Sequence, residues 1–155
     1  MINDCNYEVL RDVVFSAICG PIPKMVLIFI RNKCAAERLK DIIFDWTNIE
    51  PKVWKENYIQ YSFTAGNGAR IWIYQREKLN FTCGVRANDV IADWDYPLSD
   101  FYEILMPMSN LGIGNIYSIR VNDILYHWDK AHEKGMDDIE YWRKVRKEDE
   151  DKKPD

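Results

Sequence analysis

The stretch from Gly84 to Asp95, GVRANDVIADWD, places a short apolar run between a turn and two carboxylates. The run Val90–Ala92 has no polar residue on either face, which is typical of a strand in a sheet that is covered on both sides. Asp93 and Asp95 follow at its carboxyl end, where open α/β sheets bind their ligands. The stretch therefore predicts a buried strand with a candidate site at its end. The simpler interpretation, that the two acids only end a strand and begin a loop, stays open.

A second apolar run, Met25–Ile30 (MVLIFI), also has the composition of a buried strand. Asn32 is a good N-cap for a helix over Lys33–Trp46, and a buried strand followed by a helix is half of a βαβ unit. Alternation and turn signals predict further strands over Tyr58–Phe63, Ala69–Gln75 and Ile116–Val121, the first two joined as a hairpin by Gly66-Asn67-Gly68. Helical spacing predicts helices over Tyr7–Ile18, Asp100–Met106, Asn122–Lys134 and Ile139–Val145.

This order of elements predicts a single α/β domain over residues 1–146, with a mostly parallel sheet flanked by helices. The segment 147–155, KEDEDKKPD, has no apolar residue and is expected to be a charged, disordered tail.

The charge of the chain argues against a generally basic nucleic-acid-binding protein, because 155 residues carry a formal net charge of −4. Arg70, Arg76, Lys78 and Arg86 lie around the turns that flank the central strand. They are candidates for contacts with phosphate groups of DNA or of a nucleotide, although a solvated rim of loops is the simpler explanation.

The start of the chain, MINDCNYEV, lacks the features of a signal peptide, and the run Met25–Ile30 is too short to span a membrane. The four cysteines form no CxxC pair, so reduced and mostly buried thiols are expected. These observations predict a cytoplasmic protein that does not enter a membrane.

Two kinds of candidate contact residue stand out. Asp93 with Asp95 is a candidate Mg²⁺ site, because hard cations take carboxylate ligands, but two carboxylates without a triphosphate make a weak site. Most of the tryptophans have the phase of core residues, whereas Trp54 and Trp94 lie next to turns and are the candidates for exposed contact residues.

Six stretches, in this order, resemble the ATPase core of phage terminase large subunits, the motors that package DNA into capsids. They are KMVLIFIRNKC (24–34), the helix AAERLKDIIFDW that follows it, GARIWIY (68–74), GVRANDVIAD (84–93), FYEILMPMSNL (101–111) and IYSIRVNDILYHW (116–128).

The resemblance implies a RecA-like P-loop NTPase-type core that starts just downstream of the P-loop and is therefore truncated at its N-terminus. In this resemblance GVRANDVIAD is similar to a glycine turn with a Walker B strand, so Asp93 would be the metal-side aspartate. Arg86 in the turn is then a candidate phosphate contact, and Ser118 matches the hydroxyl residue of the coupling motif, although a packed polar residue explains Ser118 as well.

The departures from the family pattern affect its chemistry. No GxxxxGK[ST] segment is present, and the nearest run, Gly20 to Lys24, precedes a different strand and contains prolines that remove N–H donors. Trp94 stands at the position of the catalytic glutamate, and Asp95 would point to the opposite face if the strand continued. The nuclease domain of the family has no counterpart in the sequence.

Three functions follow from these observations. The first is a degenerate or partial terminase-like ATPase core that is not catalytic by itself, with Mg²⁺ as the implied cofactor and a nucleotide bound only with a P-loop from another chain. The second is a phage-derived binding module that docks on a motor subunit or a host protein and regulates or blocks it, in the host cell cytoplasm. The third is a Mg²⁺-dependent nuclease that uses Asp93 and Asp95.

Overall fold

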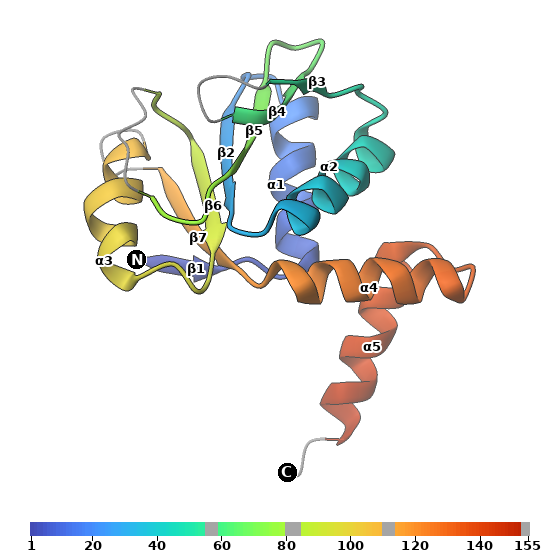
Figure 1. Cartoon of the computed structure of the whole chain (residues 1–155). Coiled ribbons are helices and arrows are strands. Elements are labelled where there is room, and N and C mark those ends of the chain that lie inside the picture. Colours follow the sequence, from blue (N-terminus) through green and yellow to red (C-terminus); the bar gives the residue numbers. More distant parts are fainter. Residues whose placement is uncertain (55–58, 80–84, 110–113, 153–155) are drawn as a thin grey trace.

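A computed structural model describes residues 1–54, 59–79, 85–109 and 114–152. Within these residues, seven strands form one sheet in the order β1-β7-β6-β2-β5-β4-β3 (Figure 1). The strands from β1 to β5 in this order are parallel to their neighbours, and β4 and β3 are added antiparallel at one edge. Their bounds are Ile2–Asp4 (β1), Met25–Ile30 (β2), Lys52–Val53 (β3), Ile59–Thr64 (β4), Arg70–Gln75 (β5), Asp89–Asp93 (β6) and Asn115–Ile119 (β7). The predicted α/β fold with a mostly parallel, helix-flanked sheet is confirmed.

Strand β2 lies at the centre of the parallel part, between β5 and β6, and all six of its residues are buried. Its side chains alternate, so that Val26, Ile28 and Ile30 pack into one core and Leu27 and Phe29 into the other. The sheet is therefore covered on both faces, as the unbroken apolar run predicts.

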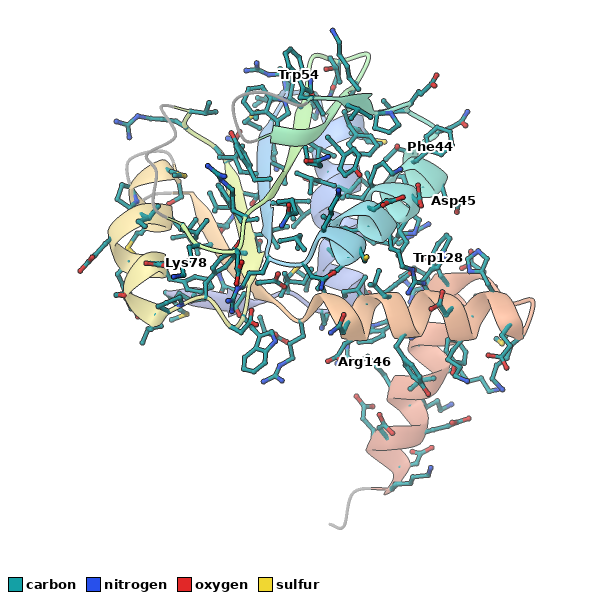
Figure 2. The ribbon with its side chains drawn as sticks, in the orientation of Figure 1. Phe44, Asp45, Trp54, Lys78, Trp128 and Arg146 are labelled. Carbon is teal, nitrogen blue, oxygen red and sulfur yellow. The ribbon has the colours of Figure 1, made fainter. Side chains whose placement is uncertain are left out.

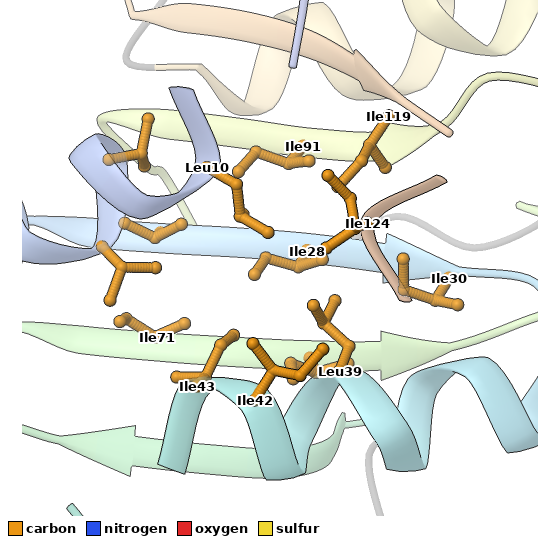
Figure 3. Packing of buried hydrophobic residues seen from close by; sticks show 14 of the residues in the cluster. Leu10, Ile28, Ile30, Leu39, Ile42, Ile43, Ile71, Ile91, Ile119 and Ile124 are labelled. Carbon is orange, nitrogen blue, oxygen red and sulfur yellow. The ribbon is translucent and has the colours of Figure 1, made fainter. Parts of the chain in front are cut away.

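Helices divide unequally between the two faces. The larger core lies under α1 (Tyr7–Cys19), α2 (Lys33–Thr47), α4 (Val121–Glu133) and the start of α5 (Asp138–Lys152). Figure 3 shows Leu10, Leu39 and Ile124 from three of these helices around Ile28 and Ile91 of the sheet. The other face is covered by α3 (Leu98–Asp100) and by the helical turns that continue it.

Several local predictions are confirmed. Asn32 caps α2, because its side chain accepts a hydrogen bond from the backbone N–H of Ala35 at 3.0 Å. Strands β4 and β5 pair antiparallel as a hairpin, and Gly68 in its turn has a φ of 92° that favours glycine. Tyr58 and Gly84, at the edges of predicted elements, lie outside the described residues.

The sequence patterns missed two short strands and misplaced several ends. Strands β1 and β3 are too short to show alternation. Strand β7 ends at Ile119, before the predicted Val121, which instead begins α4. Helix α5 continues to Lys152 and so includes most of the segment expected to be disordered, because Glu and Lys are good helix formers.

The helix predicted over Asp100–Met106 changes its hydrogen bonding along its length. After α3 it forms a π-helical turn over Phe101–Leu105, closed by the N–H of Met106 and the carbonyl of Phe101, and then a 3-10 turn over Met106–Met108. Pro107 causes this ending, since it has no N–H and its ring collides with the carbonyl of the preceding turn of an α-helix.

Cys5 is buried, whereas Cys19 and Cys34 are exposed, and all three are free thiols, so the expectation of mostly buried cysteines is wrong for the described ones. No helix within the described ranges has the length and apolar character needed to cross a lipid bilayer.

One buried carboxylate fastens α5 to the rest of the domain. Asp138 Oδ2 accepts hydrogen bonds from the Tyr7 hydroxyl and from Trp46 Nε1 at 2.7 Å, and Arg11 Nε lies 3.9 Å away. The Asp138 carbonyl lies 3.0 Å from Nε2 of the buried His127. The first turn of α5 is thus bound to α1, α2 and α4 by polar contacts, and Trp142 in the next turn packs against the larger core. The helix beyond Trp142 extends away from the domain (Figure 1).

We expect Asp138→Ala to lower the free energy of unfolding by about 2–4 kcal/mol, because it leaves the donors of Tyr7 and Trp46 buried without an acceptor. Urea denaturation measures this change. The control is Asp149→Ala, which removes an exposed carboxylate of the same helix and should change stability by less than about 0.5 kcal/mol. Equal effects of the two substitutions would show that Asp138 does not anchor α5.

Candidate functional site

A crevice lies outside the carboxyl ends of β2, β6 and β7. After β2 the chain enters α2 on one face of the sheet, whereas after the neighbouring strand β6 it enters α3 on the other face. Such a reversal is the switch point at which open α/β sheets bind ligands. The crevice has a volume of about 500 Å³ and is lined by the ends of β2 and β6 and by the first turns of α2 and α4. This size suits a small ligand or an inserted side chain of a partner.

Arg31, the first residue after β2, joins the two predicted acidic residues. Its backbone N–H donates to Asp93 Oδ2 at 2.6 Å, and its guanidinium Nη1 lies 3.1 Å from Asp95 Oδ2. The same guanidinium donates to the carbonyl of Glu77 at 3.1 Å and to that of Asp95 at 3.3 Å. We call this set of contacts the Arg31 bridge.

Asp93 and Asp95 therefore lie on the same crevice, because β6 ends at Asp93 and the strand alternation does not continue to Asp95. The expectation that Asp95 points away, which applied to a continuing strand, does not hold here.

Burial gives Asp93 an unusual ionisation. The side chain is buried, and desolvation raises its pKa to about 6, with a smaller contribution from the negative charge of Asp95. The hydrogen bond from the Arg31 N–H and the Arg31 charge act in the opposite direction but do not cancel the effect. Asp93 is thus a carboxylate that the fold holds in its charged form at neutral pH against a desolvation penalty.

Trp94 and Arg120 form the outer side of the crevice. The Trp94 side chain is 52% exposed, and the Arg120 guanidinium carbon lies 4.4 Å from the centre of its ring, a cation–π contact. Trp54, the other tryptophan expected to be exposed, is 39% exposed but lies beside β3 at the opposite end of the domain (Figure 2). Both predictions of exposure are confirmed, and only Trp94 belongs to the crevice.

The structure does not bring the other two predicted site residues to this crevice. Arg86 precedes β6, at the amino end of the strand that carries Asp93 at its carboxyl end, and donates to the carbonyl of Pro107 at 3.3 Å. Ser118 pairs with Ala92 in the sheet, one position before the strand end, and does not line the crevice.

The basic residues around the turns are also divided between the two ends of the parallel strands. Arg70 begins β5 at the amino ends of the strands, where Arg86 also lies, whereas Arg76 and Lys78 follow the carboxyl end of β5. These four residues do not form one basic surface.

Arg31 and Arg120 are two charged residues of the crevice that the sequence patterns did not single out. Each directly follows the carboxyl end of a parallel strand of the structure, although Arg120 was expected inside the strand predicted over Ile116–Val121. The rule that selected Asp93 and Asp95 therefore selects these two arginines as well, once strand order is known.

The crevice does not fit a Mg²⁺ site as its residues stand. Mg²⁺ requires near-octahedral oxygen ligands, whereas the Arg31 guanidinium pairs with the Asp95 carboxylate and the Arg31 backbone N–H occupies one oxygen of Asp93. Across the described part of the chain, no group of three or more His, Cys, Asp or Glu side chains is arranged to hold a metal ion.

The connection from β1 to α1 consists of only Cys5 and Asn6. The Cys5 N–H donates to the carbonyl of Ser118 at 2.9 Å, and the Asn6 side chain accepts from the N–H of Val9 at 2.9 Å. The Cys5 N–H is thus used in the sheet, and the Asn6 side chain is used in the cap of α1.

Compared with protein-family models, curated proteins and solved structures, the chain matches none of them.

Asp93→Asn should make stability less dependent on pH. A carboxyl whose pKa is raised on folding binds its proton more readily when folded, so the free energy of unfolding falls as pH rises from about 4 through about 6. The asparagine amide does not ionise, so the fall in the free energy of unfolding with rising pH disappears, and its oxygen can still accept the hydrogen bond from the Arg31 N–H. We expect the variant to be more stable than the parent by about 2 kcal/mol near pH 7.5, and to lose that advantage near pH 4.

Urea denaturation at the two pH values measures this difference. Asp45→Asn, at an exposed position of α2 (Figure 2), should shift stability equally at both. A destabilised Asp93→Asn at neutral pH would mean that its negative charge stabilises the fold.

Proposed function

We propose that this chain is a degenerate terminase-like ATPase core that does not hydrolyse ATP by itself and serves as a binding module for another protein. The observation that carries this proposal is the Arg31 bridge, which holds both carboxylates of the crevice. In the terminase-like interpretation Asp93 is the residue that would meet Mg²⁺, and here it accepts a hydrogen bond from the backbone of Arg31 instead.

The connection between β1 and α1 supports the same proposal. In a P-loop protein a glycine-rich loop between a strand and a helix supplies N–H groups and a lysine to the phosphates. Here β1 precedes α1, but two residues join them, and Asn6 caps the N–H of Val9. A connection of this length has no room for a phosphate cradle.

The intact packing on both faces of the sheet supports a binding role, because a protein without any function would not be expected to keep both cores. β2 and β6 remain fully buried, with Ile28 and Ile91 in the larger core and Phe29 in the smaller one. A framework that keeps both cores while its crevice lacks the groups for phosphate transfer is suited to presenting a surface to a partner, for which a motor subunit or a host protein is the proposed candidate.

We expect the purified chain with Mg²⁺ to turn over ATP no faster than its Asp93→Ala variant, because Trp94 replaces the water-activating carboxylate and no phosphate loop is formed. A phosphate-release assay measures the rates of both proteins. Turnover by the parent chain that Asp93→Ala abolishes would overturn the proposal.

Arg31→Ala should expose the two carboxylates to external cations. The substitution removes the ion pair with Asp95 and keeps only the backbone N–H to Asp93. We therefore expect millimolar Mg²⁺ to raise the thermal midpoint of Arg31→Ala but not that of the parent chain, since bound cations stabilise the folded state.

The matched control is Arg38→Ala, which removes a second arginine of the crevice that is paired with Asp129 outside it. Mg²⁺ should leave its midpoint unchanged. The same response of both variants to Mg²⁺ would show that Arg31 does not take the place of a cation.

A further inference from the structure

The segment after the crevice presents apolar side chains to solvent on one side. Phe101 and Leu105 point into the smaller core and are almost fully buried. Leu98 and Tyr102 are 64% and 52% exposed. They are four positions apart along the helical segment, so their side chains lie on the same side, one turn apart. We call this pair the α3 face.

Trp94 lies on the same segment of chain, between the crevice and Leu98. It precedes Leu98 by four residues, a length of chain that spans at most about 14 Å. Its side chain is exposed on the same connection between β6 and α3. Three large exposed apolar residues thus follow one another at intervals of four, whereas a large apolar residue exposed alone needs no explanation.

The charged side chains of the segment that carries the α3 face have one sign. Among the described residues, the cations that contact this segment from outside it lie at its ends, with Arg120 on the Trp94 ring, Arg31 at Asp95 and Arg86 at the Pro107 carbonyl. From Trp94 to Met108 the chain contains Asp95, Asp100 and Glu103 and no lysine or arginine. The Asp95 carboxylate is paired with Arg31, so Asp100 and Glu103 on the helix itself provide the negative charge beside Leu98 and Tyr102.

The helix also departs from regular geometry at this face. The π-helical turn over Phe101–Leu105 is a rare conformation that is frequently found at functional sites. Here it keeps Phe101 and Leu105 inward while Tyr102 remains outward.

We propose that the α3 face binds a basic amphipathic helix of a partner protein, with apolar residues on one side and lysine or arginine beside them. The apolar pair would fill the apolar stripe of such a helix, and Asp100 and Glu103 would meet its basic residues. Nucleic acid does not suit this surface, because its phosphates would meet two carboxylates. A symmetric second copy does not suit it either, because the two copies would bring four carboxylates and no basic residue of this segment into one small interface. This inference rests on the proposed binding role and names its partner class.

Two synthetic helical peptides with the same leucine stripe test the inference, one with lysine at every polar position and one with glutamate. Titration of the isotope-labelled full chain, followed by amide chemical shifts, gives the affinity and the location of each peptide. We expect the lysine peptide to bind at least tenfold more tightly than the glutamate peptide, with the largest shifts at Trp94–Leu105. Equal affinities, no binding of either peptide, or shifts centred on another surface would overturn the inference.

Tyr102→Ser should weaken the binding of the lysine peptide at least tenfold. Tyr126→Ser is the matched control, because Tyr126 is 65% exposed on α4 and its loss should leave affinity unchanged. Both side chains are exposed, so both variants should keep the thermal midpoint of the parent. Equal losses in the two variants would also overturn the inference.

The two proposals fail separately. ATP turnover that depends on Asp93 would overturn the non-hydrolytic function and leave peptide binding at the α3 face in place. A failure of both peptides to bind would overturn the inference about the α3 face, and it would not affect the proposal that the chain does not hydrolyse ATP.

Discussion

The arrangement of this domain depends on the burial of β2 from both sides. All six side chains of Met25–Ile30 are removed from water, and the strand is paired in parallel with β5 and β6. A parallel pair cannot be joined by a tight turn, so each strand must be followed by a crossover that lies on one face of the sheet. The helices that cover the two faces of β2 are a consequence of this requirement.

The position of the crevice follows from the same constraint. Because α2 leaves β2 on one face and α3 leaves β6 on the other, the carboxyl ends of these neighbouring strands are not covered by a single helix. The first residues after the strands line the opening, and Arg31, Asp93 and Arg120 are there for that reason. The chemistry of the crevice is therefore decided by a few residues that immediately follow strands, while the strands themselves are fixed by packing.

Two buried carboxylates of the domain illustrate opposite uses of polar burial. Asp138 is surrounded by donors from α1 and α2 and joins elements that are distant in sequence. Within the described residues, Asp93 accepts a hydrogen bond from one backbone donor only. Burial therefore raises its pKa, and the negative charge of Asp95 raises it further. A group kept charged at a cost to stability is common at functional sites, whereas a fully satisfied buried group stabilises the fold. The difference supports a functional role for the crevice and a structural role for the Asp138 contacts.

The sequence by itself determined the α/β class, the buried strands β2 and β6, the hairpin of β4 and β5 and the cap at Asn32, because each depends on a pattern within about ten residues. It also selected Asp93, Asp95 and Trp94, since acids and an aromatic residue directly after an apolar strand are visible locally. Only the tertiary structure decided that Arg31 holds both acids, that Arg86 and Ser118 lie away from them, and that Asp138 fastens α5. The physical reason is that these relations depend on strand order, on the face that each crossover takes and on the residue at which a strand ends. None of the three is visible within ten residues of sequence, and a shift of a strand end by one residue alone moves a side chain to the other face of the sheet.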